Sequence, residues 1–295
     1  EFTSTTSDVK RLLSNLENDN IDALVIDLRN NGGGHLTEAT ALTGLFIDNG
    51  PVVQLRNANG RISRLDDPDP VPRSAYNGPL IVLVNRYSAS ASEIFAAAIQ
   101  DYERGVVVGQ QTYGKGTVQN LYALDQYVRR NQDELGQLTL TIGKYYRVTG
   151  ESTQNRGVIP DIELPSYIDI DNTGESSRDT ALPWDKIKPS RYKKNQSMED
   201  SINQLRELHT ERRKTDPELI FLLKDIEESS LYRKQTTVSL NLNKRISERE
   251  EREERKEVID NLRVKANNND ETQEESEDRD INLNETAAIA TDLVK

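Results

Sequence analysis

The sequence predicts an α/β protein, a mostly parallel sheet covered by helices, followed by a charged and mainly helical region. Short apolar runs at residues 23–28, 80–84 and 106–108 alternate with segments of helical period. Strands that alternate with helices in this way are typical of a parallel sheet with both faces covered. Most of the apolar runs and glycines fall in residues 1–165, and residues 166–295 are polar. We therefore expect a packed core over residues 1–165 and a helical, partly disordered C-terminal region over residues 166–295.

The remaining elements of the core each have their own signal. Residues 8–16 and 36–47 carry apolar side chains at helical spacing, and residues 90–102 read as a third helix. Residues 137–148 alternate between polar and apolar side chains, which predicts an antiparallel or edge strand. Two prolines within residues 155–165 end the core.

The C-terminal region is divided by composition. Residues 166–195 are polar and loop-like, and residues 198–231 predict two helices broken near Asp216-Pro217. The charge run at residues 247–257 predicts a solvated helix face. The acidic stretch at residues 267–280 predicts disorder or a long loop.

Composition excludes several classes of function. The net charge of −12 argues against a general nucleic-acid surface. The absence of cysteine excludes disulfides, thiolate metal sites and a cysteine nucleophile. No stretch approaches the ~18 apolar residues of a membrane span, and no signal peptide opens the chain. Because the first residues lead directly into a helical pattern, we interpret the chain as a fragment of a longer protein.

Three informative loops leave predicted strands at the same edge of the sheet. They are the glycine turn at residues 30–34, the serine run at residues 85–92 and the loop at residues 109–119. The carboxyl ends of parallel strands meet at one edge, and loops there build the sites of α/β proteins. The topology therefore predicts that these three loops converge.

Ser90 is the candidate nucleophile in the serine run. Glu93 follows it at the spacing of a capping box, so Ser90 lies at a helix N-terminus. A serine there can attack a carbonyl while the N–H of Ala91 meets the developing oxyanion. A plain helix cap, with no catalytic role, stays open as the alternative.

Lys115 is the first candidate for the base that takes the serine proton. It stands between two glycines, which leave a long side chain free to point inward. To act as a base its pKa must fall by about 3 through burial away from water. His35, which follows the triple glycine on the correct edge, stays open as a rival base. We expect His209 on an exposed helix, away from the chemistry.

Two further polar residues invite a role. Asp101 lies eleven residues after Ser90 on the same predicted helix, or about 16 Å away, which is too far for contact. We expect it to support structure near the helix end. Gln119 lies four residues after Lys115 and could reach the ammonium only if the chain bends, since four extended residues span ~13 Å.

Four ordered motifs resemble the carboxyl-terminal processing proteases, in particular the periplasmic branch of Gram-negative bacteria. They are DLRNNGGGHLTEA, SASASEIFAAAIQDY, QTYGKGTVQ and GVIPDIELP. The resemblance covers residues 8–165, and LPWDKI with the charged tail is similar to the C-terminal region of that branch. It implies a crotonase-like ββα serine protease core, and it implies an N-terminal helical region and a PDZ domain, neither of which is visible in this chain.

The resemblance also implies a Ser-Lys mechanism through an acyl-enzyme, without metal or cofactor. Ser90 would be the nucleophile, Lys115 the general base and Gln119 the residue that orients the lysine. Asp101 matches an aspartate that the family needs, which we interpret as an indirect role. The oxyanion donors would be the N–H of Ala91 and a glycine N–H, that of Gly33 or Gly34.

The implied substrates are periplasmic proteins with apolar C-terminal tails. Some relatives work with a lipoprotein adaptor, and the resemblance allows at most a peripheral contact with the inner membrane. Two other functions stay open: a small-molecule acyl hydrolase with the same dyad, and a non-catalytic peptide-binding or scaffold protein. A nucleotide site at NNGGGH is disfavoured because the G-x-G-x-x-G spacing is absent.

Overall fold

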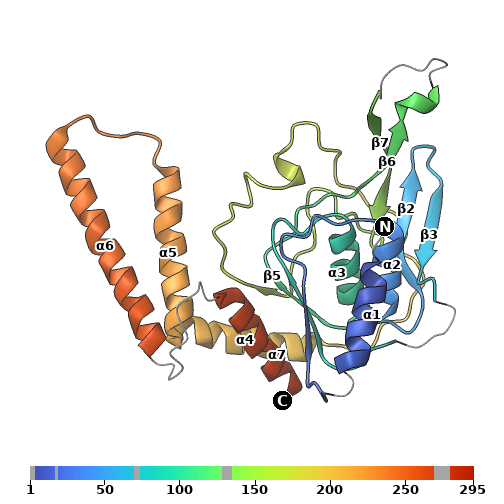
Figure 1. Cartoon of the computed structure of the whole chain (residues 1–295), viewed down its shortest axis with the longest axis horizontal. Helices are drawn as coiled ribbons and strands as arrows, with labels where there is room; N and C mark the ends of the chain where they lie inside the picture. The colour runs from blue at the N-terminus through green and yellow to red at the C-terminus, as the bar shows by residue number, and fades with distance from the viewer. Residues whose placement is uncertain (1–3, 17–18, 70–73, 128–134, 269–279) are drawn as a thin grey trace.

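The structure is a computed structural model of the 295-residue chain (Figure 1). It describes residues 4–16, 19–69, 74–127, 135–268 and 280–295. The acidic stretch predicted to be disordered, residues 267–280, falls mostly outside these ranges.

The first of two sheets is parallel, as predicted. Its order is β1 (Leu24–Asp27), β4 (Leu80–Val84), β5 (Val106–Gly109) and β8 (Ile162–Glu163). The central strands β4 and β5 are buried throughout, because both faces of the sheet are covered. Burial on both faces explains why these strands read as unbroken apolar runs.

Helices cover both faces of this sheet. On one face α1 (Thr5–Leu16), α2 (Leu36–Gly44) and α3 (Ala91–Asp101) pack against Leu80, Val82 and Val84. On the other face α4 (Glu199–Thr215) and α7 (Ile281–Val294) pack against Ile81 and Leu83. Successive side chains of a strand point to opposite faces, so β4 serves both layers. The C-terminal region therefore completes one face of the core sheet.

The second sheet is antiparallel, with the order β3 (Ile62–Asp66), β2 (Pro51–Asn57), β7 (Gln137–Tyr146) and β6 (Thr117–Ala123). The strand expected over residues 137–148 is antiparallel, and it lies inside the sheet, between β2 and β6. The β6–β7 hairpin extends away from the rest of the molecule (Figure 1). The short 3₁₀ helix η1 (Leu124–Tyr127) follows β6.

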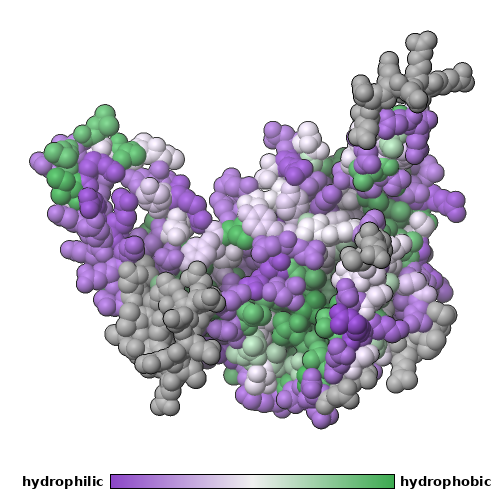
Figure 2. Space-filling model, in the orientation of Figure 1, coloured by the Kyte–Doolittle hydropathy of each residue, from purple (hydrophilic) through white to green (hydrophobic). Residues whose placement is uncertain are grey.

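The C-terminal region begins with an irregular segment that includes the 3₁₀ helix η2 (Glu175–Ser177) and continues as helices. The predicted break at Asp216-Pro217 is confirmed: α4 ends before it, and the Asp216 side chain accepts from two backbone N–H groups of α5 (Pro217–Lys234). α5 and α6 (Leu242–Asn268) form an arm, largely hydrophilic with an apolar patch at its end (Figure 2). No helix in the described ranges is long and apolar enough to cross a membrane.

His209 corrects one expectation. It lies on α4 as expected, but the residue is buried, with 4% of its surface exposed. Its Nδ1 is 2.7 Å from Oε1 of Glu285 on α7, and the same carboxylate accepts from Arg212. α4 is largely exposed, as expected, but His209 lies on its buried face because α7 packs over that face.

Candidate active site

The three loops meet at the carboxyl end of the parallel sheet. The Ala89 N–H donates to the Asn31 carbonyl at 3.0 Å, which joins the serine run to the glycine turn. The Tyr113 N–H donates to the Ser88 carbonyl at 2.9 Å, which joins the serine run to the lysine loop. The structure therefore brings together the residues that the topology predicts to be close.

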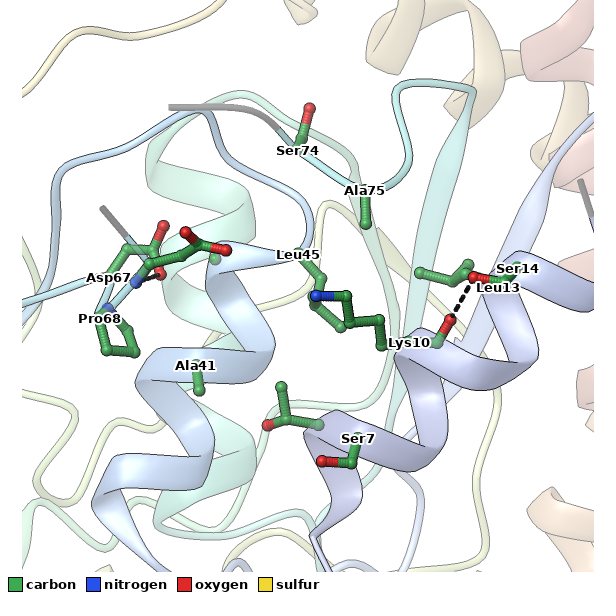
Figure 3. A pocket seen from close by; sticks show the side chains of 13 residues that line it. Ser7, Lys10, Leu13, Ser14, Ala41, Leu45, Asp67, Pro68, Ser74 and Ala75 are labelled. Atoms are coloured by element: carbon green, nitrogen blue, oxygen red, sulfur yellow. Dashed lines mark hydrogen bonds between the residues drawn. The ribbon is translucent and has the colours of Figure 1, made fainter. Parts of the chain in front are cut away.

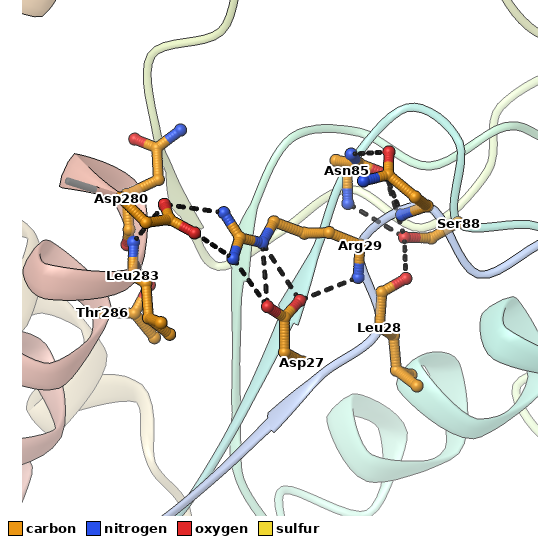
Figure 4. Close-up of polar contacts among 10 residues, drawn as sticks. Asp27, Leu28, Arg29, Asn85, Ser88, Asp280, Leu283 and Thr286 are labelled. Atoms are coloured by element: carbon orange, nitrogen blue, oxygen red, sulfur yellow. Dashed lines mark hydrogen bonds and ion pairs between the residues drawn. The ribbon is translucent and has the colours of Figure 1, made fainter. Parts of the chain in front are cut away.

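The glycine turn is held at its start by polar contacts (Figure 4). Arg29, in the turn that follows β1, pairs with Asp27 at the end of β1 and with Asp280, the residue that caps α7. Asn30 has a positive φ of 59° and exchanges hydrogen bonds with the Asn85 side chain. The turn is thus fixed from β1, from the serine run and from the last helix.

Gly33 packs directly against the start of α3. Its φ is +95°, and a Cβ there would lie 2.6 Å from the Ala89 carbonyl oxygen and 2.7 Å from the Ala91 nitrogen. Only glycine fits this conformation and this approach. The Gly33 N–H donates to Asn31 Oδ1, whereas within the described ranges no hydrogen bond uses the N–H of Gly34 or Ala91. Of the two predicted glycine donors, Gly33 is the one in contact with Ser90 and Ala91, and Gly34 is the one whose N–H has no hydrogen bond within the described ranges.

Ser90 adopts a strained backbone conformation immediately before α3. Its φ is 56° and its ψ is −113°, a region that non-glycine residues rarely occupy. Such strain is maintained only where surrounding contacts fix it, and it is concentrated at functional sites. Here the Ser90 N–H donates to Glu93 Oε2 at 2.8 Å.

Glu93 connects the serine to the lysine loop. Its side chain is fully buried; Oε2 accepts from the N–H groups of Ser90 and Lys115, the latter at 3.0 Å. Oε1 accepts from the Thr112 hydroxyl and the Gly114 N–H. Burial raises the pKa of Glu93 to about 7, against the opposing effect of these four donors. From the sequence, Glu93 was expected only to complete a capping box. The signal that could have identified it is a carboxylate within an otherwise apolar helix.

Tyr145 on β7 is a second residue that the sequence analysis did not single out. Its hydroxyl donates to the Lys115 carbonyl and lies 3.3 Å from the Ser90 carbonyl oxygen. The ring is buried, and burial raises the pKa of the phenol well above its ordinary value. Glu93 and Tyr145 therefore hold the backbones of both predicted catalytic residues.

Lys115 is half-buried and points toward Gln119. Its Nζ donates to Gln119 Oε1 at 3.0 Å, and in the described part of the chain no hydrogen bond joins Nζ to Ser90 Oγ. A register shift between Val118 and Gln119 lies between the two side chains. The residue that this shift skips is Ile142 on β7, so the irregularity lies on the strand opposite the Lys115–Gln119 segment.

Lys115 and Gln119 line a cavity of about 350 Å³. Its opposite wall comes from the C-terminal region, with Glu175 and Arg178 among the lining residues. Arg86 fixes this wall: its guanidinium is buried and donates to the carbonyls of residues 112, 170 and 173. The C-terminal region therefore forms part of the cavity beside the lysine.

Asp101 is remote from the cavity and has a structural partner. It ends α3, is buried, and forms a two-pronged ion pair with Arg147, with Nε 3.1 Å from each carboxylate oxygen. Burial raises the pKa of Asp101, and the guanidinium opposes this. Arg147 follows Tyr145 by two residues, so the ion pair supports the end of β7.

His35 directly precedes α2, and its side chain is exposed. A separate cavity of about 670 Å³ lies between α1, α2 and residues 67–69 and 74–75 (Figure 3). Its lining shares no residue with the cavity beside Lys115.

Comparison with known proteins decides the family. The model for peptidase family S41 matches residues 1–164, and the C-terminal domain of tail specific protease matches residues 168–295. The chain belongs to peptidase family S41. This S41 chain is 44% identical, over 98% of its length, to the tail-specific protease of Haemophilus influenzae, and covers 43% of that protein. The family resemblance and the α/β core with a helical C-terminal region are confirmed.

Two further relatives of the S41 chain are more distant. The carboxy-terminal-processing protease of Bartonella bacilliformis is 36% identical over 55% of this chain and 35% of that protein. The solved structure of a photosystem II D1 C-terminal processing protease is 31% identical with a TM-score of 0.47, over 55% of this chain and 40% of that one. The chain spans less than half the length of these relatives.

Proposed function

We propose that this chain is the proteolytic part of a serine endopeptidase with a Ser-Lys dyad. The observation that carries the proposal is the shared contact of Glu93 Oε2 with the N–H groups of Ser90 and Lys115. One buried atom thereby fixes the backbones of a strained serine and of a lysine from another loop. A serine that merely capped a helix would need no such link to Lys115.

In the proposed mechanism Ser90 Oγ attacks the scissile carbonyl while Lys115 Nζ takes its proton. The N–H groups of Ala91 and of Gly34 or Gly33 stabilise the oxyanion. The lysine ammonium then protonates the leaving amine, which gives an acyl-enzyme and releases the C-terminal fragment. Lys115 next removes a proton from water, and the hydroxide attacks the acyl carbonyl. The ester C–O bond breaks, and the lysine ammonium returns the proton to Ser90 Oγ as the new carboxyl terminus leaves.

Gln119 and Asp101 have supporting roles in this proposal. The Gln119 amide oxygen accepts from Lys115 Nζ and so orients the amine. Asp101 acts at a distance, through Arg147 and the end of β7. Neither residue exchanges a proton with substrate.

The proposed substrates are periplasmic proteins with apolar C-terminal tails, and a lipoprotein adaptor would deliver some of them. The resemblance to periplasmic relatives supports this compartment, and a chain without cysteine suits it. Cell fractionation tests the location. Copurification of the chain with membrane lipoproteins tests the adaptor.

The test compares Ser90→Ala and Lys115→Met with His35→Ala, the variant of the rival base. Each is assayed with an activated ester and with matched peptides that end in an apolar or a charged tail. We expect near-total loss for the first two variants and retained activity for His35→Ala. Ester cleavage without peptide cleavage would favour the acyl hydrolase, and full activity of Ser90→Ala would overturn the proposal.

A further inference from the structure

We propose that the open edge of β6 binds the substrate polypeptide as an added β-strand and leads it to Ser90, an inference that rests on the proposed function. β6 is the last strand of its sheet, with β7 on one side and, among the described residues, no strand on the other. It begins two residues after Lys115 and contains Gln119, the partner of the lysine. An unpaired edge offers main-chain groups to which an extended peptide can bind.

Hydrogen bonds at both ends of β6 determine which backbone groups are free. The Gly116 carbonyl accepts from the Tyr145 N–H at 2.9 Å, and the Leu124 N–H donates to the Gly136 carbonyl at 3.0 Å. In an antiparallel pair alternate residues direct their backbone groups at the partner strand. The even-numbered residues of β6 therefore face β7, and the N–H and C=O groups of Gln119, Leu121 and Ala123 face outward.

The outward-facing backbone groups of β6 lead along the strand to the candidate active site. Lys115 belongs to the same odd-numbered series, and its own N–H and C=O are held by Glu93 and Tyr145. From Gln119 to Ala123 the edge extends about 14 Å, which accommodates about five substrate residues. A strand bound there runs toward the cavity that Lys115 and Gln119 line.

The side chains around this edge favour an apolar partner. β6 has the sequence TVQNLYA, without a charge or a proline, although natural edge strands are commonly protected by such residues. Leu121 is 67% exposed, and Leu138 and Leu140 on β7 are also exposed. Figure 2 shows apolar residues on this hairpin. The occupant that fits is an extended, uncharged and largely apolar segment of the substrate.

Leu121→Pro tests the inference because it removes one outward N–H and leaves the bonds to β7 intact. Proline is tolerated on the open side of an edge strand. Leu121→Ala is the matched control, since it shortens the same side chain and keeps the N–H. Both variants are assayed with a small activated ester and with an apolar-tailed peptide long enough to cover the strand.

We expect Leu121→Pro to raise KM for the peptide about tenfold, to leave kcat similar and to leave ester hydrolysis within about twofold. Leu121→Ala raises the peptide KM less, about threefold. Equal peptide KM values for the two variants would overturn the inference. The inference would also be overturned if Leu121→Pro left the peptide KM unchanged but altered the molecular mass in solution. That result would mean that the edge of β6 pairs copies of the chain.

A second variant covers damage to the hairpin. Equal losses of ester and peptide hydrolysis with a lower Tm would mean that Leu121→Pro damages the hairpin itself. Ala123→Pro, which lies farther from Lys115, then replaces it, and a raised peptide KM with unchanged ester hydrolysis is again the expected result. Failure of the proposed function has a different signature, since Ser90→Ala would then still hydrolyse the ester.

Discussion

Replacing Glu93 with Gln tests whether the buried carboxylate organises the site. The carboxylate accepts four hydrogen bonds, two on each oxygen. The amide of Gln places an NH₂ group against two of these donors, so at least one buried donor loses its partner. We expect this misplacement of the Ser90 and Lys115 backbones to lower kcat for the ester about 100-fold.

The same substitution changes how stability depends on pH. The pKa of Glu93 rises from 4.5 to about 7 on burial, which corresponds to about 3 kcal/mol. Because burial favours the protonated carboxyl, Glu93 stabilises the folded state fully below pH 4.5, and this stabilisation is lost as the pH rises through about 7. Glu93→Gln cannot titrate, so the difference in unfolding free energy between parent and variant changes by about 3 kcal/mol across that window.

Urea unfolding at a series of pH values measures this difference. Glu38→Gln is the matched control, because its difference in unfolding free energy from the parent should change with pH in the opposite direction. Hydrogen bonds from Thr6 lower the pKa of Glu38, so its contribution is lost as the pH falls. Parallel stability profiles for the parent and Glu93→Gln would refute the reasoning, because titration of Glu93 would then be independent of folding.

Three further substitutions test the surroundings of the site. Gly33→Ala places a Cβ 2.6 Å from a backbone oxygen at a positive φ. We expect it to lower the unfolding free energy measured with urea by about 2 kcal/mol and to lower kcat. Gly32→Ala, where the added Cβ meets open space, is the control and should change neither quantity. Asp101→Asn leaves the Arg147 charge buried and unpaired, which costs about 3 kcal/mol, and an unchanged urea midpoint would contradict this. Asp280→Ala removes the N-cap of α7 and should lower the unfolding free energy by about 1 kcal/mol, seen as a lower Tm. Amide hydrogen exchange should increase first in α7.

The elements that the sequence predicts well are those whose signal is local. Strand β4 was predicted with its observed bounds because a strand buried on both faces is a continuous apolar run. The break between α4 and α5 was predicted from Asp216-Pro217 alone. The β2–β3 hairpin was missed although Asn59-Gly60 lies in its turn, a pair typical of tight hairpins.

The parts that the sequence could not predict depend on distant partners. His209 is buried because Glu285, 76 residues away, lies on a helix that packs over it. Tyr145 acquires its role only when β7 is placed beside the loops of Ser90 and Lys115. The convergence of the three loops was predictable because the topology of a parallel sheet alone requires it.

The docking of α7 has a consequence for biosynthesis. Ile289 and Ala290 cover Ile81 and Leu83, and Asp280 meets Arg29 across 251 residues of chain. Until α7 has been synthesised, this side of the central sheet lacks the part of its cover that α7 supplies, and Arg29 lacks its contact with Asp280. The turn beside Ser90 therefore gains its contact with Asp280 only after α7 has docked.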